Sequence, residues 1–552
     1  MLTITPHPYQ DAAIDRAVER GSLLIAFEMG LGKTVIAVAT LEELLGMGEI
    51  DCALVVVPPS LKYQWAQQIA KLTDVDTREI TVKGDDGERQ TITVPTEEYA
   101  VIMDGTPKKR ADLYTKIKDT RPDYVIMGYP NVVDDWNSVR RIKPGAIVLD
   151  EVTAIKTFKA QRTRKIKRLT APFRYGLTGT AVENGKPEEI FSQMQWIDDS
   201  VLGRFDLFDS TFIVRNGFGG VVRYKNLGVL HQKLKDAMVR KTALDPDVAP
   251  YMPESVSRKV PVTMDAKTKK AYNVLVADLL EQLAAVKPGS GGDFDVFNHY
   301  HGSGDFDENT QQGQIMARMG AIDMLLNHPD LLINSGMNYQ ESEKQRQAGV
   351  TKKNWPGSKY AYEVWQSGLL DDITTTPKLD VCIEEIEVIL GQNPKNKVII
   401  FSVNPDMLEL IDDRLPEGLA VLYHGKMNAG RKAASAARFM QDEDCRVFLS
   451  SHAGAFGTDL YMANHLINYD LAWSSGKQDQ INARHARAAS TFSTVFIHNL
   501  LTTGTTEVRK YASLAQKRRV GSAIMDGKGA DDKGRIDNDL ETLTEYLKGQ
   551  QV

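Results

Sequence analysis

Residues 22–34 read Ser-Leu-Leu-Ile-Ala-Phe-Glu-Met-Gly-Leu-Gly-Lys-Thr, an apolar run that leads directly into a short loop with two glycines. A buried strand followed by Gly-Lys-Thr and a helix is typical of nucleotide-phosphate sites, because glycines let backbone N–H groups approach the phosphates. In such a loop Lys33 reaches the terminal phosphates and the Thr34 hydroxyl can bind Mg²⁺. The general pattern has a glycine where this chain has Phe27, so the turn must depend on the two later glycines. The stretch predicts a phosphate loop at the end of a buried strand.

The composition is ordinary and limits the classes of protein to consider. The 552 residues carry 67 Lys and Arg and 73 Asp and Glu, a net charge of −6. This balance argues against a uniformly basic nucleic-acid coat protein but permits a local basic channel. Three cysteines, far apart in the chain, make neither a zinc pattern nor a disulfide framework, which favours a reducing compartment. Neither a signal-peptide pattern nor an apolar run of the ~20 residues that span a membrane occurs, so we expect no membrane partner.

Short, wholly apolar runs alternate with helical patterns in two parts of the chain. Such runs suit strands that are buried on both faces of a parallel sheet. The first set comprises Leu23–Phe27, Ala53–Val57, Tyr124–Met127, Ala146–Leu149 and Arg174–Leu177, with a helix expected over Thr34–Leu45. The second set comprises Lys397–Val403, Ala420–Tyr423, Arg446–Ser450, His465–Tyr469 and Thr494–Asn499.

These two sets predict an α/β fold with two doubly wound parallel-sheet lobes. We place the first lobe at residues 1–184 and the second at 376–503. Residues 185–375 read as helical protrusions, a linker and mobile insertions, including the Lys287–Gln314 tract and a charged stretch near 338–358. Residues 504–552 would form a brace and a C-terminal tail, with a short helix-like end at Asp539–Leu547.

A pair of carboxylates, Asp150 and Glu151, ends one of the apolar runs of the first lobe. A phosphate loop needs such a second acidic site for its metal ion and its water. Asp150 would hold Mg²⁺ together with Thr34, and Glu151 would orient or deprotonate the attacking water.

Leu177-Thr178-Gly179-Thr180-Ala181-Val182-Glu183-Asn184 follows another strand, and with it the chain resembles the Swi/Snf-type ATPases of helicase superfamily two. That family reads Asp-Glu-Met-Gly-Leu-Gly-Lys-Thr, Asp-Glu-Ala-His-x-Ile-Lys-Asn and Leu-Thr-Gly-Thr-Pro-x-x-Asn at the positions of residues 27–34, 150–157 and 177–184. Further matches in the family's order extend over about residues 8–515. The resemblance implies two RecA-like lobes that use ATP and Mg²⁺.

The resemblance also implies roles for individual residues. Gln10 would read the adenine edge, and Arg484 and Arg487, which would share a helix face, would act as arginine fingers. The residues expected to bind nucleotide are Gln10, Met29, Gly30, Leu31, Gly32, Lys33, Thr34, Gly457 and Asp459. Those expected to couple the ATP site to DNA are Thr178, Thr180 and Gln480, and those expected to contact DNA are Ser60, Lys62, Ser402, Gly425 and Trp473.

Four positions depart from the family pattern. Thr153 replaces a histidine that usually links the metal site to the coupling segment, so that relay is weaker or rebuilt here. Phe27 replaces an aspartate, Ala181 replaces a proline, and residues 488–490 replace Ile-Gly-Gln. None of these changes removes a residue that we expect to act in hydrolysis.

We therefore expect a monomeric, ATP-dependent translocase on double-stranded DNA that displaces or remodels DNA-bound proteins. One alternative within the same fold is a strand-separating or branch-processing helicase or annealing enzyme. Another, of a different class, is a regulatory DNA-binding module with little turnover, which the changes at Phe27 and Thr153 suggest. Only seven residues precede Pro8, and this compact form suggests a bacterial or phage source. The expected location is the cytoplasm, in association with the nucleoid.

Overall fold

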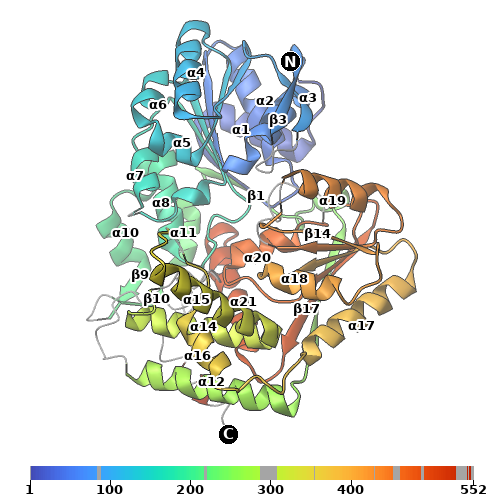
Figure 1. Cartoon of the computed structure of the whole chain (residues 1–552). Coiled ribbons are helices and arrows are strands. Elements are labelled where there is room, and N and C mark those ends of the chain that lie inside the picture. The colour runs from blue at the N-terminus through green and yellow to red at the C-terminus, as the bar shows by residue number, and fades with distance from the viewer. Residues whose placement is uncertain are drawn as a thin grey trace.

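A computed structural model of the chain shows two parallel sheets, each covered by helices on both faces (Figure 1). The prediction of two doubly wound lobes is confirmed. No helix of the described residues is both long enough and apolar enough to cross a membrane. The structure describes residues 2–83, 89–158, 160–216, 220–285, 307–352, 355–427, 429–451, 460–486, 490–529, 544 and 546–548. Most of the Lys287–Gln314 tract and of the Asp539–Leu547 segment lies outside these residues.

The first lobe has a seven-stranded parallel sheet with the order β11-β1-β8-β7-β2-β6-β5. Because β1, β8 and β7 are neighbours, the loops that follow them meet at one edge of the sheet. The strands are β1 (Ser22–Phe27), β2 (Ala53–Val57), β5 (Ala100–Ile102), β6 (Tyr124–Gly128), β7 (Ala146–Asp150), β8 (Phe173–Leu177) and β11 (Met238–Lys241). An antiparallel pair, β3 (Thr77–Lys83) and β4 (Arg89–Pro95), forms a separate two-stranded sheet.

The unbroken apolar runs arise because alternate side chains of a strand enter two different cores. Leu24 and Ala26 of β1 lie in one core, whereas Leu23, Ile25 and Phe27 lie in the other. The second core is covered by α1 (Pro8–Arg20), α2 (Lys33–Gly46) and α3 (Lys62–Leu72). The first is covered by α4 (Pro107–Thr120), α5 (Tyr129–Asp134), α6 (Trp136–Ile142), α7 (Gln161–Ile166), α8 (Pro187–Ile197), α9 (Asp199–Leu202), α10 (Phe205–Phe212) and α11 (Leu227–Leu234).

The second lobe has a six-stranded parallel sheet with the order β12-β17-β16-β13-β15-β14. Its strands are β12 (Glu254–Val262), β13 (Val398–Phe401), β14 (Ala420–Tyr423), β15 (Val447–Ser450), β16 (His465–Asn468) and β17 (Thr494–Thr502). Its helices are α17 (Pro377–Gln392), α18 (Pro405–Asp412), α19 (Ala429–Gln441) and α20 (Ser475–Asn482), and α21 (Thr506–Met525) follows the last strand.

The segment predicted to be only helices and insertions also contributes strands to both sheets. β11 extends the first sheet beside β1, and β12 extends the second beside β17. A hairpin of β9 (Ile213–Arg215) and β10 (Val221–Tyr224) lies between the lobes in sequence. The search for apolar runs missed β11 and β12 because they are edge strands, which need no continuous apolar sequence; β12 exposes most of its side chains, and β11 keeps one buried and three half-buried.

Four helices pack around a core of their own: α12 (Ala266–Ala284), α14 (Gln311–Asn327), α15 (Pro329–Gln347) and α16 (Lys359–Gln366). This helical part lies beside the second lobe, at the bottom left of Figure 1. The charged stretch near 338–358, predicted to be a loop or mobile insertion, is instead helical as far as Gln347.

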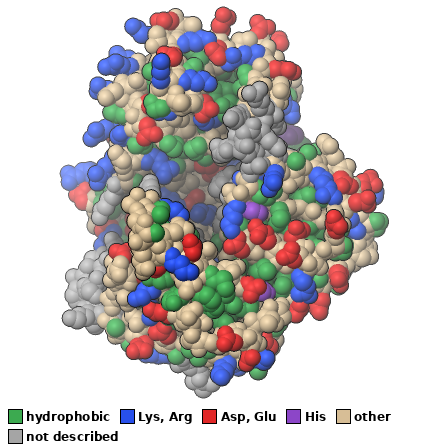
Figure 2. All heavy atoms as spheres, viewed as in Figure 1, with side chains coloured by type: hydrophobic (Ala, Val, Ile, Leu, Met, Phe, Trp, Pro, Cys, Tyr) green, Lys and Arg blue, Asp and Glu red, His purple; other side chains and the backbone are tan. Residues whose placement is uncertain are grey.

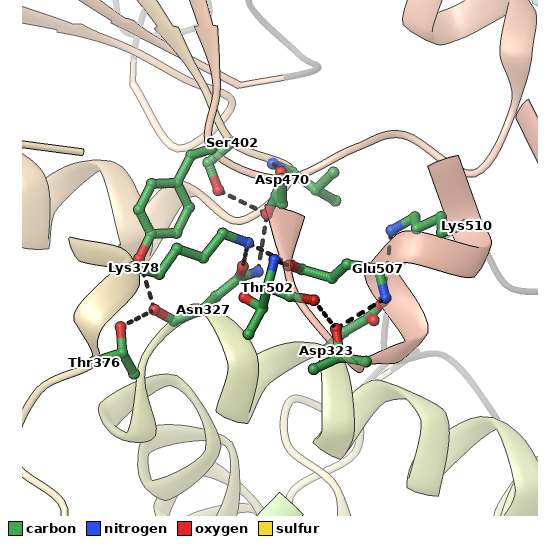
Figure 3. A network of polar contacts seen from close by, with 12 residues as sticks. Asp323, Asn327, Thr376, Lys378, Ser402, Asp470, Thr502, Glu507 and Lys510 are labelled. Carbon is green, nitrogen blue, oxygen red and sulfur yellow. Dashed lines mark hydrogen bonds and ion pairs between the residues drawn. The ribbon is translucent and has the colours of Figure 1, made fainter. Parts of the chain in front are cut away.

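A buried polar network joins the helical part, the second lobe and α21 (Figure 3). Lys378 of α17 is 1% exposed; it forms an ion pair with Glu507 and donates to Asn327 Oδ1 at 3.1 Å. Asn327 and Ser402 both donate to Asp470 Oδ2, at 2.9 and 3.0 Å. Burial raises the pKa of Asp470, although the nearby Lys378 charge opposes this shift. The network therefore depends on a cation at position 378.

We expect Lys378→Met to destabilise the protein by about 3–5 kcal/mol, because it leaves buried carboxylates without their cation. Urea denaturation at pH 7 measures the loss, and Lys395→Met at an exposed position is the matched control. The double variant Lys378→Met/Glu507→Leu removes both charges and should recover part of the loss. If Lys378→Met unfolded at the same urea concentration as the wild type, this account would be wrong.

Candidate active site

The phosphate loop links β1 to α2 through two glycines in the left-handed region. Gly30 has φ +85° and Gly32 has φ +81°, a conformation that side-chain-bearing residues adopt at a cost. A Cβ atom at Gly32 would also lie 2.2 Å from Gln10 Nε2. Helix α2 begins at Lys33, so its unpaired N–H groups face the loop and form a cradle for an anion.

Lys33 and Gln10 hold the loop from either side. Lys33 Nζ donates to the carbonyls of Phe27 at 3.0 Å and Glu28 at 3.3 Å. Gln10 is 5% exposed; its Nε2 donates to the Leu31 carbonyl at 3.1 Å, and its Oε1 accepts from a backbone N–H. The adenine contact of Gln10 stays a prediction, and the structure shows that its amide braces the loop.

The predicted acidic pair ends β7 beside the phosphate loop. Asp150 accepts hydrogen bonds from Trp65 Nε1 at 2.7 Å and from the Glu151 backbone N–H at 2.9 Å. Glu151 has φ +49°, an uncommon backbone conformation for a residue with a side chain. Such strain tends to occur at functional sites.

The electrostatics of Glu151 suit a proton-accepting group. Burial, reinforced by the adjacent Asp150 carboxylate, raises the pKa of Glu151 to about 7, whereas the charge of Lys33 acts to lower it. Glu151 Oε2 is buried and has no hydrogen-bond partner among the described residues. A carboxyl group with a pKa near neutrality and an unused oxygen is typical of a general base.

The second lobe contacts this site through the amino end of α20. Ser475 Oγ donates to the Glu183 carbonyl at 2.6 Å, and the Gly476 N–H donates to the same oxygen at 3.3 Å. A Cβ atom at Gly476 would lie 2.8 Å from Thr180 Oγ1. Thr178 Oγ1 in turn accepts from the Thr180 N–H at 3.1 Å. The structure thus brings the predicted coupling residue Thr180, with Thr178 bonded to it, against α20, which also carries the buried Gln480.

Arg484 of the second lobe lies near enough to Glu151 that its charge acts to lower the pKa of that carboxyl. The expectation that one helix carries both arginines is wrong for Arg484, since α20 ends at Asn482. The chain leaves the helix where the Arg484 carbonyl accepts from the Leu460 N–H at 3.3 Å. Arg487, Gly457 and Asp459 lie outside the described residues.

The residues predicted to contact DNA divide into two groups. Ser60 and Gly425 are exposed, as a direct contact requires. Lys62, by contrast, is 8% exposed and forms an ion pair with Asp104 at 2.5 Å. Ser402 belongs to the buried network, and Trp473 packs in the helical core with Lys510 Nζ 4.2 Å from its ring centre. Burial therefore contradicts a direct DNA contact by Lys62, Ser402 and Trp473 in this conformation.

Arg240 is the residue whose role the sequence did not reveal. Its Nη1 donates to the Ala26 carbonyl at 2.9 Å and the Gly179 carbonyl at 3.4 Å, and its Nε donates to Asp526 Oδ1 at 2.9 Å. Its Nη2 lies 3.4 Å from Glu28 Oε1. The only sequence signal was the basic pair at 240–241, which gives no partner. Arg240 lines an interlobe cavity of about 350 Å³ together with Met29, Thr180, Asp479, Arg518 and Asp526.

Two family descriptions match the chain: the SNF2-related domain over residues 13–317 and the Helicase conserved C-terminal domain over residues 377–489. The helicase domain of Hef from Pyrococcus furiosus has the same fold, with a TM-score of 0.50, 18% identity, and coverage of 92% of this chain and 98% of that one.

The chain is also similar to curated proteins along most of its length. It is 23% identical to the DNA repair and recombination protein RAD54 of Saccharomyces cerevisiae over 92% of this chain and 53% of that protein. It is 21% identical to YwqA of Bacillus subtilis, which has a provisional assignment as an ATP-dependent helicase/translocase, over 91% of this chain and 46% of that protein. The chain spans about half the length of these relatives. Because the SNF2-related domain covers more than half of the residues and the ATPase motifs meet in one site, the chain belongs to the SNF2-related family of helicase-type ATPases.

Proposed function

We propose that this chain is a DNA-dependent ATPase that moves along double-stranded DNA and displaces or remodels the proteins bound there. The observation that carries the proposal is the contact between the lobes at the ATP site, where Ser475 and Gly476 of the second lobe donate to the Glu183 carbonyl of the first. Hydrolysis at such a site requires the lobes to be closed, so a cycle of closing and opening can move a strand held across both. The names of the two relatives, which concern DNA repair and helicase or translocase activity, agree with this proposal.

The residues present fit ATP and Mg²⁺. The glycine loop and the amino end of α2 suit a polyphosphate, and a Cβ atom at Gly32 would obstruct the loop. No group of three His, Cys, Asp or Glu side chains forms a metal site within the described part of the chain. This agrees with Mg²⁺, which is commonly held by one or two carboxylates together with substrate phosphates. Thr34 and Asp150 would hold the ion, which supplies charge neutralisation at the phosphates.

The remaining steps of hydrolysis and coupling depend on individual residues of the chain. Glu151 orients the attacking water and accepts its proton at Oε2, while Arg484 stabilises the charge that develops on the transferred phosphoryl group. Thr178 and Thr180 transmit the state of this site to α20, since Thr180 lies against Gly476 and donates its N–H to Thr178. Arg240 positions the phosphate loop, since it donates to the Ala26 carbonyl near the end of β1 and to the Gly179 carbonyl in the loop that follows β8.

We expect duplex DNA to stimulate ATP hydrolysis, measured as phosphate release with and without duplex, single-stranded, forked and four-way DNA. Lys33→Ala should bind duplex DNA but lose about a hundredfold or more in turnover, because it removes a preorganised cation. The wild type should evict a triplex-forming third strand while it releases little strand from a fork. Absence of DNA-stimulated turnover would exclude a motor, and efficient strand release would favour a strand-separating helicase.

Arg484→Ala should lower kcat by about a thousandfold, in the range of other arginine fingers, with a smaller change in KM for ATP. Steady-state kinetics at saturating duplex DNA provide the test. Arg414→Ala, at an exposed position of the same lobe, is the matched control and should leave kcat unchanged. A variant that changed KM alone would show that Arg484 binds the ground state and has no special part in the transition state.

Glu151→Gln should abolish turnover yet stabilise the protein free of nucleotide and metal. Folding raises the pKa of this carboxyl from 4.5 to about 7, so the folded state destabilises its ionised form. The wild type therefore loses stability relative to the variant as the pH rises from about 4.5 to 7, and the difference reaches about 2–3 kcal/mol above pH 7. Urea denaturation at pH 4.5 and pH 8 measures the difference. Equal stability of the two proteins at pH 8 would contradict the shifted pKa.

A further inference from the structure

The end of α15 and the segment that leads to α16 carry a run of cations in sequence, next to the carboxylates of Glu308 and Glu343. Residues 344–362 include five Lys or Arg and no Asp or Glu, in a chain whose net charge is −6. Two of the cations, Arg346 and Lys352, gather around one aromatic ring. The Arg346 guanidinium lies 5.1 Å and the Lys352 Nζ 5.3 Å from the ring centre of Trp355. We name these three residues the α15 ridge.

The backbone that carries Trp355 is fixed on α15 by close packing. Gly357 has φ +94°, and a Cβ atom there would lie 2.1 Å from the backbone nitrogen of Tyr339. Ser342, 2% exposed, donates from its Oγ to the Pro356 carbonyl at 2.9 Å. The carboxylate of Glu308 accepts from the first N–H groups of α16, at 3.1 and 3.0 Å. The ridge is thus a rigid platform.

The cations of the ridge remain available to a partner. The Arg346 side chain is 44% exposed, and its contact with Glu343 is a surface ion pair of the kind that contributes little to stability. Lys352 Nζ donates to Gln345 Oε1 at 2.7 Å and can donate further hydrogen bonds. Trp355 is engaged by both cations, so it holds charge in place and offers no free platform for stacking an unpaired base.

Helix α15, whose last turn carries Arg346, points towards the space between the lobes. In Figure 1, α15 rises from α14 towards the first lobe. Figure 2 shows the surface hollowed between the lobes and the helical part, with Lys and Arg side chains around the hollow. The phosphates of a duplex that crossed both lobes would pass close to these Lys and Arg side chains.

We propose that the α15 ridge binds the backbone phosphates of duplex DNA where it leaves the interlobe site. This inference rests on the proposed function, since it adds a contact to the same DNA path. Arg and Lys that neutralise phosphates release counterions, and they position a duplex without reading its sequence. The ridge would extend the DNA-contacting surface beyond the two lobes.

The test compares Arg346→Ala/Lys352→Ala with the wild type, both as the full chain without nucleotide. Fluorescence anisotropy gives Kd over a range of salt concentrations for a duplex that extends past the lobes and for an equally long single strand. The variant should bind the duplex about tenfold more weakly at low salt. The slope of log K against log salt should fall by about 2, since each phosphate contact contributes about 0.9. The single strand should show a smaller change.

Matched variants make the result specific. Lys395→Ala/Arg414→Ala removes two exposed charges of the second lobe and should bind as the wild type does. Arg346→Lys/Lys352→Arg keeps both charges and should keep the salt slope. Basal ATP hydrolysis should be unchanged in all variants, because no ridge residue belongs to the ATP site.

Several outcomes would overturn the inference. These are an unchanged Kd and salt slope in the double-alanine variant, an equal loss in the Lys395/Arg414 control, a larger loss on the single strand, and a wild type that binds no duplex. Failure of the proposed function would be seen separately, as ATP turnover that duplex DNA does not stimulate. Such a result would leave the binding comparison at the ridge intact.

Discussion

The contact between the amino end of α20 and the loop that follows β8 is the interaction on which the composite site depends. The Glu183 carbonyl accepts from both Ser475 Oγ and the Gly476 N–H. Because Gly476 has no side chain, the backbone of α20 reaches Thr180 closely enough that a Cβ atom would lie 2.8 Å from its hydroxyl. This approach places the end of α20, and Arg484 just beyond it, opposite the acidic pair. The first lobe alone would present a phosphate loop and a carboxylate pair without a facing arginine.

The same geometry creates an electrostatic problem that the chain resolves only in part. The parallel order of β1, β8 and β7 brings the consecutive carboxylates Asp150 and Glu151 near the phosphate loop in a buried place, and burial raises the pKa of both. Lys33 and Arg484 offset this repulsion, one from each lobe. Glu151 is left with a pKa near neutrality, a left-handed backbone and an Oε2 that has no hydrogen-bond partner within the described part of the chain. The carboxylate pair therefore lowers the stability of the free protein, and its uncompensated charge is available when ATP binds.

The lobes and the heart of the site could be predicted from sequence, because buried parallel strands and glycine loops have short-range signatures. All ten predicted strands occur, and the phosphate loop, Asp150, Glu151 and Arg484 meet as expected. Edge strands β11 and β12 were missed because they lack a continuous apolar run. Lys62, Ser402 and Trp473 were misplaced because side chains alone do not show whether they face solvent or an internal partner. Arg240 could not be foreseen, since its partners are 61 to 286 residues away in sequence.

Helix α21 shows how these distant contacts constrain the motion of the lobes. Its first turn carries Glu507, which is paired with Lys378 in the buried network of the second lobe. Beyond its last turn lies Asp526, which accepts from Arg240 beside the phosphate loop. The helix has 20 residues and is therefore about 30 Å long, a rigid rod at this scale.

If the lobes separate, helix α21 cannot stretch, so one of its two ends must release its ion pair or the helix must bend. The exposed fractions of Lys378 and Arg240, 1% and 18%, indicate that the ion pair at Arg240 costs less to break than the one at Lys378. The same end of α21 also packs Ile524 and Met525 into the core of the first lobe, so α21 couples the support of the phosphate loop to the packing of both lobes.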